Sequence, residues 1–253
     1  MSGGYVPTWE LHQRDALAHL ASMDTGSVDA VITDPPYSSG GMMRGDRTGN
    51  TRVKYTGSKT ELPSALDFAG DNRDGHGWAY WMTLWLSEAL RVTTVGGALV
   101  MFTDWRQLPT ATDSIQAGGW VWRGVVPWIK PDARPQRGRF TQSAEFVVWG
   151  TAGPRGLVGD TLPGYYHARV PRNNDPGGRH HITEKPLDVM RSLVRICPDG
   201  GTVLDPFAGA GTTGRAALLE GRRFIGCEIT EHYAEVSRQR IAEAAEPLDH
   251  MST

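Results

Sequence analysis

Strand-like and helix-like hydrophobic patterns alternate along most of the 253-residue chain. Short apolar runs typical of strands occupy Thr8 to Gln13, Val28 to Thr33, Ala98 to Phe102, Trp120 to Ile129, Ala144 to Trp149, Thr202 to Leu204 and Arg223 to Glu228. Helical spacing marks Ala16 to Ala21, Trp78 to Val92, Pro186 to Ile196, Thr212 to Leu219 and Glu231 to Ala245, and another helix is expected after Pro109. This alternation is typical of a doubly wound α/β sheet. It predicts one domain over residues 1–253.

The segment 38–75 lacks this periodicity and is rich in Gly, Ser, Thr and Arg. A structureless stretch of that length inside a compact domain is usually a functional or mobile loop. We therefore expect a loop insertion at this point. The stretch from Gly150 to His180 is also irregular, with glycine and proline throughout.

Charge and composition exclude several classes of protein. The chain has 26 Lys and Arg against 28 Asp and Glu, so it cannot coat nucleic acid by bulk electrostatics and would meet a polyanion only through a local patch. No apolar run approaches the ~18 residues of a membrane helix, and the first residues lack a secretory signal. We expect a cytoplasmic chain without a membrane partner. Cys197 and Cys227 are expected to be buried free thiols, and no metal site is predicted.

The tetrapeptide Asp34-Pro35-Pro36-Tyr37 follows the apolar run Val28 to Thr33. A stiff turn after a strand is one explanation, but it does not account for the tyrosine. The exocyclic amine of adenine or cytosine is a poor nucleophile because its lone pair is delocalised into the ring. Asp34 supplies an ionised acceptor, and the prolines present carbonyls without a competing N–H, so the site can stabilise positive charge developing on that nitrogen. Tyr37 would stack on a base rotated out of the duplex.

A second motif, Asp205-Pro-Phe-Ala-Gly-Ala-Gly-Thr-Thr-Gly214, joins a predicted strand to a predicted helix. Its glycines, with Glu228 at the end of the next strand, also match the dinucleotide fingerprint. In that fingerprint glycine directly follows the strand, whereas here Asp205 holds that place. A carboxylate would repel pyrophosphate and attract the ammonium and sulfonium of S-adenosylmethionine. We therefore favour S-adenosylmethionine over NAD, with Glu228 accepting hydrogen bonds from ribose hydroxyls.

These motifs resemble the β class of DNA amino-methyltransferases, in which the motif order is permuted. The resemblance spans Leu11 to Tyr233 and includes His181-x-x-Glu184-Lys185-Pro186 between the other two motifs. It implies a Rossmann-like methyltransferase sheet with a small irregular recognition region at about 130–180. It also implies that Asp34, Pro35, Pro36 and Tyr37 hold the target base, and that the cofactor is bound by Asp15, Lys185, Pro186, Asp205, Phe207, Gly209, Gly211, Thr212 and Glu228. Asp15 lacks the usual preceding glycine, so a helix N-cap is an equal alternative for it.

The resemblance also bears on the substrate. Members that methylate N6 of adenine usually carry Asp at the first motif position, whereas those acting on N4 of cytosine usually carry Ser, so Asp34 favours adenine. Cytosine N4 stays open because both reactions need the same acceptors. Methylation of RNA or of a protein amide, an NAD-dependent oxidoreductase and a catalytically silent nucleic-acid binding module are further alternatives. The two intact motifs disfavour the last two.

Double-stranded DNA is the predicted partner, and three irregular segments carry clustered basic residues that could contact phosphates. The candidates are Arg44 and Arg47 in the loop insertion, Lys130, Arg134, Arg137 and Arg139 in a second segment, and Arg169, Arg172 and Arg179 in a third. The alternative for each segment is an ordinary solvated face. About 35 residues are left for sequence recognition, fewer than a typical domain. A homodimer and a partner nuclease therefore stay open.

Overall fold

The computed structural model describes residues 8–37, 74–135, 137–157, 159–172 and 184–246. Its strands are β1 (Trp9–Gln13), β2 (Val28–Thr33), β3 (Thr93–Thr103), β4 (Val121–Ile129), β5 (Ala144–Thr151), β6 (Tyr166–His167), β7 (Thr202–Asp205) and β8 (Arg223–Glu228). Its helices are α1 (Ala16–Ser22), α3 (Gly75–Val92), α4 (Leu108–Ala117), α5 (Leu187–Val194), α6 (Thr212–Leu219) and α7 (Glu231–Ala245).

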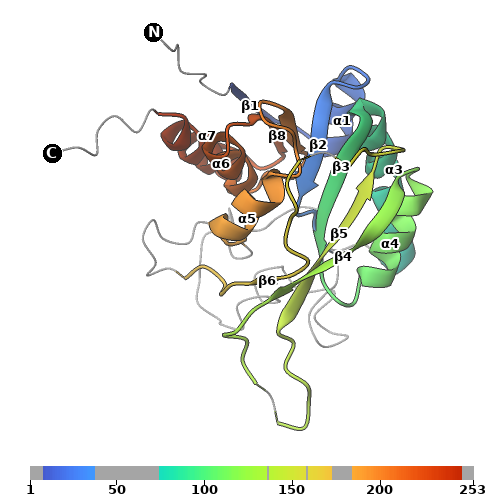
Figure 1. The fold of residues 1–253 in the computed structure, drawn as a ribbon, viewed down its shortest axis with the longest axis vertical. Coiled ribbons are helices and arrows are strands. Elements are labelled where there is room, and N and C mark those ends of the chain that lie inside the picture. Colours follow the sequence, from blue (N-terminus) through green and yellow to red (C-terminus); the bar gives the residue numbers. More distant parts are fainter. Residues whose placement is uncertain (1–7, 38–73, 136, 158, 173–183, 247–253) are drawn as a thin grey trace, which may run out of the picture.

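All these strands join one sheet in the order β1-β8-β7-β2-β3-β5-β4-β6. Strands β1, β8, β7, β2 and β3 are mutually parallel, whereas β5 runs antiparallel to both β3 and β4. Figure 1 shows α5, α6 and α7 on one face of the sheet and α1, α3 and α4 on the other. The doubly wound α/β prediction is therefore confirmed.

The side chains of the central strands point alternately to the two faces of the sheet, and each face has its own hydrophobic core. Ile32 and Val203 pack into the cluster beneath α5, α6 and α7, whereas their neighbours Val31 and Leu204 pack into the cluster beneath α1 and α3. Successive strand side chains point to opposite faces, so a strand covered by helices on both faces is apolar at nearly every position. This is the continuous apolar pattern that marked these strands in the sequence.

The late position of β7 and β8 in the chain has a direct structural consequence. These two strands lie beside β2, which comes near the beginning of the chain, and all three are parallel. Their carboxyl ends therefore meet at one edge of the sheet, where α/β folds of this kind usually bind ligands.

Two elements begin three or more residues before their predicted starts, and one short strand was not predicted. Helix α3 begins at Gly75, three residues early, because Asp74 caps it by accepting a hydrogen bond from the Gly77 N–H at 2.6 Å. Strand β3 begins at Thr93, ahead of two glycines that obscured the pattern. Strand β6 was missed because two residues show no alternation.

Both cysteines are buried free thiols. No described helix combines the length and the apolar character needed to cross a membrane. Within the described ranges, no three His, Cys, Asp or Glu side chains gather in a way that could hold a metal ion.

Candidate active site

Three carboxylates stand in a row at the carboxyl ends of adjacent strands. Asp34 directly follows β2, Asp205 ends β7 and Glu228 ends β8. The Thr33 hydroxyl donates to Asp205 Oδ1 at 2.6 Å, which ties the end of β2 to the end of β7. The two motifs that the sequence singled out, about 170 residues apart, are thus brought together at one edge.

The Asp34 carboxylate has a donor on each oxygen. The Tyr37 hydroxyl donates to Oδ1 at 2.5 Å, and the Lys185 ammonium donates to Oδ2 at 2.6 Å. Burial raises the pKa of Asp34 above its usual value, although Lys185 and Tyr37 both act against that rise. The main-chain oxygen of Pro36 is also occupied, because it accepts a hydrogen bond from the Trp78 indole at 2.8 Å.

Lys185 lies on the Asp34 side of this edge, although the sequence placed it among the cofactor residues. Its ammonium contacts two carboxylates, with Glu145 Oε2 at 3.3 Å as well as Asp34. Burial lowers the pKa of Lys185, but the two carboxylates outweigh burial and raise the pKa above its usual value. Glu145 Oε1 in turn accepts a hydrogen bond from Lys130 at 3.0 Å. Pro186 is buried directly before α5.

Asp205 is almost fully buried, and burial raises its pKa to about 6. Its Oδ1 accepts the Phe207 N–H at 3.0 Å in addition to the Thr33 hydroxyl. The Phe207 ring packs against two tryptophans of α3, with centroid distances of 5.4 Å to Trp81 and 5.2 Å to Trp85. A single carboxylate held in this way is suited to a cationic group, because an isolated buried charge is strongly unfavourable.

The glycine turn is held by close packing and by Glu228. Gly211 has φ +79°, and a β-carbon there would lie 2.5 Å from Ser237 Oγ, so this position requires glycine. The Gly209 N–H donates to Glu228 Oε2 at 3.0 Å. In a dinucleotide site such an amide would face pyrophosphate, so the geometry disfavours NAD. Glu228 Oε1 accepts from the Thr230 amide and hydroxyl, and an ionised carboxylate retains room for a further donor.

A buried ion pair contacts the glycine turn from α7. The sequence did not identify this pair as part of the site. Arg240 of α7 pairs with Glu184 at 2.5 Å and also donates to the Ala210 oxygen at 2.6 Å. The Thr212 hydroxyl, a predicted cofactor contact, lies 3.5 Å from Glu184 Oε1. Arg240 could have been found from the sequence, because it is a basic residue on the apolar face of a predicted amphipathic helix.

Asp15 has a structural role consistent with the alternative considered for it. Its carboxylate accepts a hydrogen bond from the Ala18 N–H at 3.0 Å and caps α1. The preceding Arg14 amide donates to the Glu228 main-chain oxygen at 3.0 Å, so Asp15 also stands at the edge that carries Glu228. Its contact with a cofactor stays a prediction.

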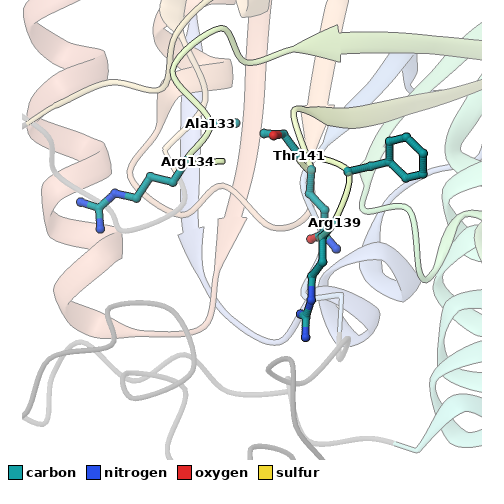
Figure 2. Close-up of a pocket in the computed structure, with 6 residues that line it drawn as sticks. Ala133, Arg134, Arg139 and Thr141 are labelled. Atoms are coloured by element: carbon teal, nitrogen blue, oxygen red, sulfur yellow. The ribbon is translucent and has the colours of Figure 1, made fainter. Parts of the chain in front are cut away.

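The predicted DNA-contacting residues fall into three groups. Arg134, Arg137, Arg139 and Arg169 are exposed, and Figure 2 shows Arg134 and Arg139 extending from the segment that joins β4 to β5. Lys130 pairs with Glu145 and the exposed Arg172 pairs with Asp132, at 3.0 Å each. Arg44, Arg47 and Arg179 lie outside the described residues.

Comparisons with known proteins agree on one family. The DNA methylase family model N6_N4_Mtase matches residues 28–239. The "Putative methylase YubD" of Escherichia coli (strain K12) is 30% identical over 242 residues, covering 91% of this chain and 88% of that protein.

Two solved structures share the fold. M1.HpyAVI in complex with SAM has a TM-score of 0.67 at 21% identity, covering 92% of this chain and 99% of that chain. The cytosine-N4-specific PvuII DNA methyltransferase has a TM-score of 0.70 at 16% identity, covering 96% and 94%.

Proposed function

Because this chain belongs to the family of N6-adenine and N4-cytosine DNA methylases, we propose that it methylates N6 of adenine in double-stranded DNA. The observation that carries the proposal is the position of Asp34. This carboxylate follows β2 directly beside Asp205 at the end of β7, so a group that binds an amine and a group suited to a cation lie next to each other. In the resemblance described above, Asp at the first motif position is usual for enzymes acting on adenine.

S-adenosylmethionine supplies the electrophilic methyl group when it is bound. The residues at this edge fit it, because buried Asp205 offers a negative charge to a cationic ligand and Glu228 retains acceptor capacity for a hydroxyl. The turn after Asp205 and the first residue of α6 complete the proposed cofactor site. They contribute Phe207, Gly209, Gly211 and Thr212.

The amine of the target base needs two acceptors. Asp34 provides one through its carboxylate. Since Trp78 occupies the Pro36 oxygen, we assign the second acceptor to the main-chain oxygen of Pro35. Fixed acceptors favour the transition state because positive charge develops on the amine nitrogen only as its bond to the methyl carbon forms. The bond between the methyl carbon and the cofactor sulfur breaks as the nitrogen–carbon bond forms, and the nitrogen passes one proton to solvent as the neutral methylated amine is produced.

Tyr37 is the proposed stacking partner of the base. Its ring is half-buried beside Asp34 and its hydroxyl is fixed by that carboxylate, so the ring is held at the acceptor. A base must leave the duplex before its amine can reach a buried acceptor. An aromatic face at that point would stabilise the extruded base.

Product analysis tests this proposal. The chain is incubated with unmethylated duplex DNA of mixed sequence and with S-adenosylmethionine bearing a deuterated methyl group, and the digested nucleosides are separated by mass. We expect labelled N6-methyladenosine in the deoxy series, and none with Asp34→Ala. Labelled N4-methylcytosine would overturn the choice of base, and no labelled nucleoside from DNA would overturn the activity.

A further inference from the structure

Asp34 is occupied on both oxygens before any base is present. Tyr37 holds Oδ1, and the Lys185 ammonium holds Oδ2 at 2.6 Å. An ionised carboxylate keeps further lone pairs, so an incoming amine could reach Oδ2, but it would share that oxygen with the ammonium. A cation that stayed on Asp34 would also repel the positive charge that develops on the amine nitrogen. The site therefore needs another place for the Lys185 charge.

Glu145 of β5 offers that place. Its Oε2 lies 3.3 Å from Lys185 Nζ, an ion-pair distance, yet within the described residues no donor forms a well-aligned hydrogen bond to this buried oxygen. Buried polar atoms are almost always satisfied, so an oxygen aimed at a neighbouring ammonium is ready to accept a hydrogen bond from it. Lys130 holds the other oxygen of Glu145 at 3.0 Å and fixes the carboxylate in this orientation.

The surroundings of Lys185 restrict where its ammonium can go. Its side chain is only 6% exposed, and its Nζ lies 5.5 Å from the Tyr37 ring centroid and 5.1 Å from that of Phe102. A buried ammonium cannot give up one carboxylate without another anionic partner. Movement toward Glu145 keeps the charge paired and needs only a small displacement, because the two groups are already within ion-pair distance.

We infer that Glu145 is a positioning residue that takes the Lys185 ammonium when the target amine binds, and thereby frees Asp34 Oδ2 for that amine. The inference rests on the proposed role of Asp34 as the amine acceptor. Glu145 contacts neither base nor cofactor in this account and acts only through Lys185. The cluster of Asp34, Lys185, Glu145 and Lys130 thus exchanges the ammonium on Asp34 for the substrate amine and keeps every charge paired.

A double-mutant cycle tests whether Glu145 acts through Lys185. Glu145→Gln keeps the shape of the side chain and removes its charge. We expect kcat to fall by about tenfold or more, because the ammonium would have to leave Asp34 without a charged partner to receive it, with the dissociation constant for S-adenosylmethionine unchanged. In the Lys185→Met background, the same substitution should change kcat by less than about twofold, as expected when two residues act as one unit. Equal effects in both backgrounds would overturn the inference.

A binding measurement keeps the test valid if Lys185→Met does not fold. Duplexes that carry either adenine or purine, which lacks the N6 amine, at the methylated position and opposite an abasic site are compared in the presence of S-adenosylhomocysteine, so that neither base is paired. Wild type should prefer adenine, and Glu145→Gln should lose most of that preference while binding the purine duplex normally, because purine brings no amine to displace Lys185. An unchanged preference would refute the role of Glu145.

Glu88→Gln is the matched control, since Glu88 forms a surface ion pair with Arg91 on α3. It should leave both kcat and the adenine preference unchanged. Failure of the proposed function is seen separately. If Asp34→Ala retained turnover, the amine acceptor itself would be misassigned, whereas an inactive Asp34→Ala beside a fully active Glu145→Gln would reject only the inference.

Discussion

The indole of Trp78 donates a hydrogen bond to the main-chain oxygen of Pro36 at 2.8 Å, across 42 positions of sequence. Trp78 is buried in the first turn of α3, so this contact joins the helix layer to the segment that follows β2. It also occupies one lone pair of the Pro36 oxygen. The contact therefore supports the proposed choice of the Pro35 oxygen as the acceptor for a substrate amine.

Trp78→Phe tests this choice. The substitution keeps most of the apolar packing and removes the indole donor. We expect kcat to fall about fivefold, the equivalent of one net hydrogen bond of roughly 1 kcal/mol, while the dissociation constant for S-adenosylmethionine stays the same. Single-turnover methylation at saturating cofactor is the measurement.

Trp120→Phe is the control for that variant. Trp120 is also buried, and its indole donates to the Leu86 main-chain oxygen at 2.9 Å. It precedes the amino end of β4, opposite the carboxyl strand ends that carry Asp34 and Asp205. The two variants should lose similar stability, but only Trp78→Phe should slow turnover. Equal turnover in both variants would show that the Pro36 contact is structural alone.

The sequence predicted every described strand except β6, together with the acidic ends of β2, β7 and β8, because both signals are local. A run of apolar residues followed by Asp34 or Asp205 is visible within a few positions. The partner of Lys185 was not predictable in this way, since the contact with Asp34 spans 151 positions and depends on β7 and β8 inserting beside β2. Glu145 did leave a signal, as a charged residue inside the otherwise apolar run Ala144 to Trp149.

Asp205 should make cofactor binding depend on pH. Its pKa is raised to about 6 by burial, so below pH 6 the carboxyl becomes neutral and loses its attraction for a cationic ligand. The affinity for S-adenosylmethionine should then fall by up to about tenfold per pH unit. Titration calorimetry from pH 5 to pH 8 measures this. Asp205→Asn should bind weakly at every pH, and a variant that kept the wild-type pH dependence would contradict the assignment.

The same substitution should have the opposite effect on stability. The folded pKa of about 6 lies above the usual 3.8, so the folded protein holds this proton more tightly than the unfolded chain. Its free energy of unfolding therefore falls as pH rises from about 4 to 6, by up to about 3 kcal/mol. Asp205→Asn should recover much of this lost free energy of unfolding above pH 6, and should differ little from wild type below pH 4. Denaturant unfolding at both pH values separates a local charge effect from general misfolding.

Arg134 and Arg139 provide a test of the DNA path. Both are exposed in the segment between β4 and β5, whereas Lys130 is held by Glu145 inside the cluster. Replacing both arginines with Ala should weaken DNA binding and reduce the slope of log K against log salt by about 0.9 for each phosphate that is no longer neutralised. Fluorescence anisotropy over a range of salt gives the slope. Arg238→Ala on α7, whose side chain pairs with Glu235, should leave the slope unchanged.

Tyr37 should contribute to base binding through its ring. Tyr37→Ala is expected to lose about 1–3 kcal/mol of DNA binding, the range for one stacked base, whereas Tyr37→Phe should keep most of it. With 2-aminopurine at the methylated position, wild type and Tyr37→Phe should both raise the fluorescence as the base leaves the stack. No rise in either protein would mean that the base stays in the duplex.

The Tyr37 hydroxyl has a separate role that the same variant isolates. It donates to Asp34 Oδ1 at 2.5 Å, and this hydrogen bond lowers the pKa of a carboxyl that burial has raised. Tyr37→Phe removes the donor, so the pKa of Asp34 should rise further. Because ionised Asp34 is the proposed acceptor, activity that is lost on acidification should be lost at a higher pH in the variant. A pH profile of single-turnover methylation shows the shift directly. An unmoved acidic limb in Tyr37→Phe would mean that ionised Asp34 does not limit turnover, since stacking alone would leave the pH dependence unaltered.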